Sequence, residues 1–226
     1  MFNLENLEKI KEMAPSVQIV AVSKFASIND ILSAYYAGLK HFGENKVQHL
    51  IEKSKELNNI GKDDLCWHFI GRLQSNKIKH LFAVPNLKYI HSVDSLKLLK
   101  ELYQKQELLN QNKVQYFLQI NTSMEQEKGG VVDRNALYEM INYILSQEKA
   151  QLEFIGLMTM GRLRASDFEK EAEVCFSQLF QYREEIEKTF PISDLKLSMG
   201  MSQDYKIAIK HGADFIRIGS ALFEDH

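Results

Sequence analysis

The chain has 226 residues, of which 45% are hydrophobic and 26% are charged, the ordinary composition of a globular protein. A formal net charge of -2 provides no basic surface for nucleic acid, and every apolar run is too short to span a membrane. Two widely separated cysteines, Cys66 and Cys175, form no metal-binding or redox motif, so we expect reduced thiols in a cytoplasmic protein without a bound metal.

The first elements place a lysine at a position typical of reactive groups. Helical spacing of apolar residues predicts a leading helix at 1–13, and the apolar run at 17–23 predicts a strand buried on both faces. Lys24 follows this strand directly, and Ser27 begins the next helix with Asp30 as its capping partner. In α/β folds the loop from a strand into a helix carries chemistry. Taken alone, this stretch favours a solvated loop lysine, because lysines are mostly exposed.

The rest of the chain alternates between short apolar runs and amphipathic segments. The apolar runs predict strands at residues 39–43, 65–70, 87–91, 114–120, 152–157, 195–198 and 214–218. Helical spacing predicts helices at residues 28–37, 47–57, 78–83, 95–109, 134–147, 168–188 and 203–210.

Alternation of this kind predicts a parallel sheet with helical crossovers. Eight strand–helix units without a linker indicate an α/β protein, a single closed (β/α)₈ barrel of the TIM type in which residues 1–226 form one domain. An open doubly wound sheet is the alternative, but no glycine-rich turn follows the first strand.

In a barrel the carboxyl ends of all strands meet at one rim, so distant residues can converge there. The rim candidates are Lys24, Asn45, His68, His91, Asn121, Met158, Ser198 and Arg217.

The last two strands carry the most specific signal. Ser-Met-Gly-Met-Ser at 198–202 joins the seventh strand to a helix, and Arg-Ile-Gly-Ser at 217–220 joins the eighth to a short last helix. Small residues at helix starts let backbone N–H groups surround an anion, and this fold often binds phosphate after these strands. Two ordinary helix caps are the alternative.

A lysine across the rim from a phosphate site suggests a phosphorylated aldehyde as the ligand. A partly desolvated lysine amine can attack a carbonyl carbon and form a Schiff base. Arg217 could contact a ring nitrogen of this ligand, or could form a salt bridge at the rim. Because arginine stays charged, it would keep a pyridine nitrogen unprotonated.

Seven short motifs resemble those of the pyridoxal phosphate homeostasis proteins, in the same order and spacing over nearly the whole chain. The motifs are Ala-Val-Ser-Lys (21–24), Phe-Gly-Glu-Asn (42–45), Trp-His-Phe-Ile-Gly (67–71), Leu-Gln-Ser-Asn-Lys (73–77), Gly-Leu-Met-Thr (156–159), Leu-Ser-Met-Gly-Met-Ser (197–202) and Ile-Arg-Ile-Gly (216–219).

The resemblance implies a barrel similar to the amino-terminal domain of alanine racemase, holding pyridoxal 5′-phosphate as a Schiff base on Lys24. It implies that Asn45 lies near the ring and that Arg217 faces the ring nitrogen. The remaining cofactor-binding residues are Ser198, Gly219 and Ser220 around the phosphate, together with Met201.

Three departures from the family pattern accompany these matches. Ser220 stands where threonine is usual, which keeps the hydroxyl, and Gln203 stands where the family has a second acid near the phosphate. The last residues, 223–226, lack the usual Gly-x-Arg ending.

The resemblance predicts a protein that binds pyridoxal phosphate, buffers it or delivers it to apo-enzymes, and has no catalytic residues for strong turnover. A pyridoxal-phosphate-dependent racemase is the first alternative, but the sequence ends at His226 and we expect no second domain with an opposing base. A Schiff-base aldolase is the second, although an aldolase lysine normally lies on a later strand. We expect His41, His68 and His91 to be buried, hydrogen-bonded residues rather than metal ligands.

Overall fold

The computed structural model describes residues 1–110, 112–125, 129–148, 151–161 and 167–223. In this part of the chain, eight parallel strands form a closed barrel in sequence order. The strands are β1 (Gln18–Val22), β2 (His41–Glu44), β3 (Cys66–Phe69), β4 (Leu87–Val93), β5 (Val114–Gln119), β6 (Leu152–Met158), β7 (Lys196–Ser198) and β8 (Phe215–Ile218).

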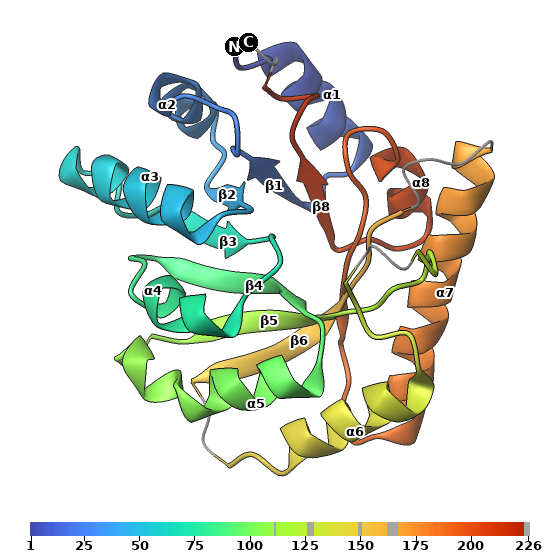
Figure 1. Ribbon diagram of the computed structural model, residues 1–226. Helices are drawn as coiled ribbons and strands as arrows, with labels where there is room; N and C mark the ends of the chain where they lie inside the picture. Colours follow the sequence, from blue (N-terminus) through green and yellow to red (C-terminus); the bar gives the residue numbers. More distant parts are fainter. Residues whose placement is uncertain (111, 126–128, 149–150, 162–166, 224–226) are drawn as a thin grey trace.

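The helices lie around the outside of this barrel, with the long α7 beside the last strands (Figure 1). The α-helices are α1 (Leu4–Met13), α2 (Ile28–Tyr36), α3 (Val47–Asn59), α4 (Ile78–Phe82), α5 (Leu96–Gln104), α6 (Arg134–Leu145), α7 (Phe168–Thr189) and α8 (Tyr205–Lys210). Two 3₁₀ helices, η1 (Ser75–Lys77) and η2 (Gln106–Leu109), precede α4 and follow α5.

Pairing between the first and last strands closes the barrel. Gln18 pairs with Phe215 and Ala21 with Ile218 in a parallel register. The closed (β/α)₈ architecture with its leading helix, predicted from the alternation of patterns, is therefore confirmed. A closed sheet has no free edge, and it brings the carboxyl ends of all its strands to one rim.

Two hydrophobic clusters fill the molecule. The larger one lies between the strands and the surrounding helices, and it includes Trp67 and Tyr116 among its fully buried side chains. The smaller one, inside the barrel, consists of Val20, Phe117, Met158 and Phe215. Because both faces of each strand are covered, the strands read as nearly continuous apolar runs.

Three segments differ from the sequence-based expectation. The helix expected at 95–109 ends at Gln104 and continues as η2. The helix expected at 203–210 begins at Tyr205, because the N–H groups of Asp204 and Tyr205 both donate to Met201 O and form a turn there. The segment after β8 is a turn that ends at Leu222 rather than a helix, Phe223 forms an isolated bridge with Phe2, and 224–226 lie outside the described residues.

In the described part of the chain, no helix combines the length and the apolar character needed to cross a membrane.

Candidate functional site

A cavity of about 570 Å³ opens at the carboxyl ends of the strands, and Lys24 lies on its wall. Lys24 is exposed and comes two residues after β1, with its Nζ 4.8 Å from the centre of the Phe25 ring. Five other candidate site residues line the cavity, namely Asn45, Met201, Arg217, Gly219 and Ser220. Ser198, the remaining candidate, does not line it. The closed barrel thus brings residues from four different strand ends to one place.

Arg217 is the buried cation of this cavity. Its Nη1 donates to Ser198 Oγ at 2.6 Å, and its Nη2 donates to the backbone oxygen of Thr159 at 2.8 Å. Burial lowers the pKa of the guanidinium to about 10, while the carboxylate of Asp204 acts in the opposite direction. A pKa of about 10 leaves Arg217 protonated at neutral pH. The two hydrogen bonds therefore hold the charged guanidinium in one position and one orientation at the base of the cavity.

Ser198, expected at a phosphate, lies behind Arg217 instead. Its side chain is fully buried, and its Oγ bridges Arg217 and His91 Nδ1, the latter at 2.8 Å. Because its partners His91 and Arg217 are themselves buried, this side chain points into the barrel rather than toward the rim. Its role in the structure is to hold the guanidinium of Arg217.

A turn after β7 and the start of the turn after β8 form the polar end of the cavity. Ser202 Oγ accepts hydrogen bonds from the N–H groups of Gly219 and Ala221, both at 3.2 Å, and so joins the two turns. Among the described residues, no acceptor receives the backbone N–H groups of Ser202, Gln203 and Ser220. Unsatisfied N–H groups gathered at one end of a cavity suit an anionic ligand.

Three histidines, the fully buried His91 and His68 and the half-buried His41, continue the hydrogen-bonded chain from Ser198 across the barrel. His91 Nε2 lies 2.9 Å from His68 Nδ1, and His68 Nε2 lies 2.8 Å from His41 Nδ1. Tyr89 stacks on the His68 ring at 4.2 Å, and Phe117 stacks on the His91 ring at 4.6 Å. All three histidines are hydrogen-bonded, as expected, but only His68 and His91 are buried, and the rings bond to one another in a continuous chain.

Arg217 decides where the protons of this chain lie. A guanidinium can only donate, so Ser198 Oγ accepts from it. Among the described residues His91 Nδ1 is the only other partner of this hydroxyl, so we assign the hydroxyl hydrogen to the bond with His91 Nδ1. His91 then donates from Nε2 to His68, and His68 donates from Nε2 to His41. Burial, together with the nearby charges, lowers the pKa of His68 and His91 well below the usual value. Both imidazoles are consequently neutral, each with one defined tautomer.

A buried ion pair holds the two loops that carry Lys24 and Asn45. Glu44, fully buried, accepts from Ser23 Oγ at 2.7 Å and from Lys53 Nζ at 2.8 Å. Lys53 also donates to the backbone oxygen of Ser23 at 2.6 Å. Because Ser23 precedes Lys24 and Glu44 precedes Asn45, this pair fixes both site residues relative to each other.

Sequence reasoning missed the histidine chain and the ion pair. The rim assignment placed His68 and His91 at the mouth of the barrel, whereas both side chains are fully buried inside it. A usable signal was present, since His41, His68 and His91 lie on three successive strands. Neighbouring parallel strands place such residues side by side once the register is known.

The family model for the alanine racemase N-terminal domain matches residues 4–226. Among curated proteins, a pyridoxal phosphate homeostasis protein of Schizosaccharomyces pombe is 39% identical over 208 residues, which cover 92% of this chain and 84% of that protein. The protein of the same name from Helicobacter pylori is 41% identical over 210 residues and covers 92% of this chain and 88% of its own length.

Solved structures agree with this relationship. PipY of Synechococcus elongatus, solved with pyridoxal phosphate bound, superimposes with a TM-score of 0.85 at 35% identity, over 97% of this chain and 99% of its own. An alanine racemase of Clostridium difficile shares the fold, with a TM-score of 0.71 at 14% identity over 98% of this chain and 56% of that enzyme.

Proposed function

Since the chain belongs to the pyridoxal phosphate homeostasis proteins, which carry the alanine racemase N-terminal domain, we propose that it binds pyridoxal 5′-phosphate in a Schiff base with Lys24. Its role is then to take part in the homeostasis of the cofactor inside the cell, by buffering it or delivering it to apo-enzymes. We further propose that it acts in the cytoplasm as a single cofactor-binding domain.

The observation that supports this proposal most directly is the content of one cavity. It holds an exposed lysine, a buried arginine, and a polar end with free backbone N–H groups. The bound cofactor supplies an aldehyde carbon at one side of its ring, a phosphate at another, and a ring nitrogen. The lysine suits the aldehyde carbon, the arginine suits the ring nitrogen, and the backbone N–H groups suit the phosphate. The residues of the cavity therefore fit pyridoxal phosphate.

Lys24 supplies the amine that bonds to the aldehyde carbon, with the carbonyl oxygen leaving as water. Its position after β1 is held from behind by the buried contact between Ser23 and Glu44. Asn45, exposed on the same wall, offers an amide beside it.

Arg217 provides the contact for the ring nitrogen. Two of its N–H donors are already committed to Ser198 and Thr159, which orient the guanidinium plane and leave the others for a ligand. Because Arg217 stays charged, it donates to a ring nitrogen that carries no proton. A ring in this state withdraws fewer electrons, which favours storage of the cofactor over catalysis.

The phosphate is assigned to the polar end of the cavity. The N–H groups of Ser202, Gln203 and Ser220 are the donors available there, and the Ser220 hydroxyl adds another. Gly219 supports this end indirectly, since its N–H already donates to Ser202 Oγ. Met201 lines the wall next to these donors.

The proposal is tested by the visible spectrum of the purified protein before and after borohydride reduction. We expect a Schiff-base absorption band, and after reduction a covalent adduct that mass spectrometry maps to Lys24. Lys24→Ala should lose both, whereas Lys55→Ala, an exposed lysine of α3 outside the cavity, should keep both. An adduct on another lysine, or no band after incubation with the cofactor, would refute the proposal.

A further inference from the structure

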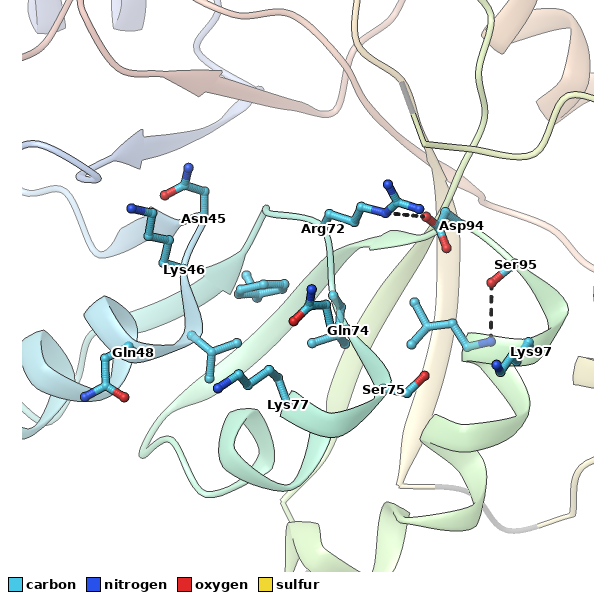
Figure 2. Close-up of a pocket in the computed structure, with 14 residues that line it drawn as sticks. Asn45, Lys46, Gln48, Arg72, Gln74, Ser75, Lys77, Asp94, Ser95 and Lys97 are labelled. Atoms are coloured by element: carbon cyan, nitrogen blue, oxygen red, sulfur yellow. Dashed lines mark hydrogen bonds and ion pairs between the residues drawn. The ribbon is translucent and has the colours of Figure 1, made fainter. Parts of the chain in front are cut away.

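A second cavity of about 550 Å³ lies beside the first, between the starts of α3, η1 and α5 (Figure 2). Asn45 and Arg72 line both cavities. The loops that carry these residues touch at Gly71, where an added Cβ would lie 1.9 Å from the backbone oxygen of Asn45. The shared wall is therefore formed by backbone in close contact, and Gly71 is required there because no side chain fits.

Positive charge dominates the rim of this second cavity. Lys46, Lys77, Lys97 and Arg72 line it, against a single acid, Asp94. Asp94 Oδ2 is 3.9 Å from Arg72 Nε. Among the described residues, no carboxylate lies within the 4.0 Å ion-pair distance of the three lysine amines. The rim thus carries more cations than acids, although Glu101 lies near enough to Lys97 for this lysine to contribute to the lowered pKa of the Glu101 carboxyl.

Four apolar side chains form the floor of the second cavity, whose remaining lining is polar or charged. Val47, Phe69, Leu73 and Leu98 line it, and all four side chains are buried. The start of α3 adds to the positive charge, since its N-cap residue, Lys46, makes no side-chain hydrogen bond to the first-turn N–H groups. An apolar floor under a cationic rim suits a ligand with a flat ring and an anionic group.

The shape distinguishes between a small molecule and a protein partner. A volume of about 550 Å³ lies within the roughly 300–1,000 Å³ typical of small-molecule sites. A protein partner would need about 800 Å² of surface on each side, whereas these cations line a single hollow. Both the chemistry and the shape favour an organic phosphate of modest size.

We propose that the second cavity binds a small organic phosphate such as a nucleoside monophosphate, with the phosphate at the lysines and the ring against the apolar floor. The three lysines lie outside the Lys24 cavity, so the proposal does not rest on the cofactor. Because Asn45 and Arg72 belong to both walls, occupation of one cavity alters the surroundings of the other.

The probe for this site is adenosine 5′-monophosphate, titrated into the cofactor-loaded protein by calorimetry. We expect saturable binding that weakens about tenfold or more in a Lys46→Gln/Lys77→Gln/Lys97→Gln triple variant, which loses its charge-assisted contacts. The matched control is Lys55→Gln/Lys113→Gln/Lys188→Gln, three exposed lysines outside both cavities that remove the same charge. Its affinity should stay within about twofold of the original protein, as expected for distant, screened charges.

Amide chemical shifts locate the bound probe. We expect shifts at Val47, Ser75 and Lys97, and weaker binding of adenosine or inorganic phosphate alone, since each lacks one half of the ligand. Equal loss in the two triple variants, shifts confined to Ser202 and Ser220, or no saturation at about 10 mM probe would each overturn the proposal. If the protein does not bind the cofactor, the same titration is made on the unloaded protein. The residues whose amide signals shift then show which of the two cavities binds the probe.

Discussion

Acidification provides a direct test of the buried histidine chain. Burial is the main cause that lowers the pKa of His68 and His91 well below 6.5, so both imidazoles are neutral in the folded protein. In the unfolded chain they take up protons near their ordinary pKa of about 6.5. Below that pH the unfolded state binds more protons than the folded state, and stability therefore falls as the pH falls.

The size of this effect follows from the two pKa values involved. A pH of 5.5 lies about one unit below the pKa of histidine in the unfolded chain. At this pH, each imidazole that stays neutral in the folded protein lowers the free energy of unfolding by about 1.4 kcal/mol. Two such residues give a loss of about 3 kcal/mol between pH 7.5 and pH 5.5. This is a large share of the roughly 5–15 kcal/mol that stabilises a typical domain.

The measurement is the free energy of unfolding in urea at pH 7.5 and at pH 5.5. His91→Gln, which keeps a hydrogen-bonding side chain that does not titrate, should remove about half of the loss, or about 1.4 kcal/mol. Imidazole nitrogen spectra of the folded protein supply a second readout, since His68 and His91 should remain neutral at pH 5.5. Equal stability at both pH values, or titration of either ring near pH 6.5, would refute the reasoning.

Three further predictions concern the site. Ser198→Ala should lower the free energy of unfolding by about 2–5 kcal/mol, since it leaves Arg217 Nη1 and His91 Nδ1 without their buried partner; a loss under about 1 kcal/mol in chemical unfolding would contradict this. Ser202→Ala combined with Ser220→Ala should weaken pyridoxal phosphate about tenfold more than unphosphorylated pyridoxal, measured by absorbance titration, and equal losses would place the phosphate elsewhere. The loaded protein should racemise, transaminate or decarboxylate amino acids far more slowly than the roughly 1–10³ per second typical of enzymes, because Arg217 keeps the ring nitrogen unprotonated; enzyme-like rates that vanish in Lys24→Ala would overturn this reading.

The amino-acid sequence by itself determined the architecture. Short β-branched runs, separated by amphipathic segments with recognisable caps, allow only a parallel sheet with helical crossovers. Eight such units in one chain favour closure into a barrel. The position of Lys24, directly after a run buried on both faces, followed from the same local pattern, because strand ends and helix starts are set by nearby residues.

The tertiary structure decided which face of each strand points into the barrel. In strands that are apolar on both sides, alternation shows two faces but does not distinguish the barrel interior from the helix-covered exterior. Ser198 illustrates the consequence, since its position at a strand end was read correctly while its inward direction behind Arg217 was not.

The histidine chain and the Glu44–Lys53 ion pair were likewise decided by the tertiary structure. His41, His68 and His91 are more than twenty residues apart in sequence, and only the stagger between neighbouring strands brings their rings within hydrogen-bond distance. Glu44 and Lys53 meet because α3 folds back along β2 after an intervening loop. These contacts depend on register and packing across the closed barrel, which no local pattern of residues contains.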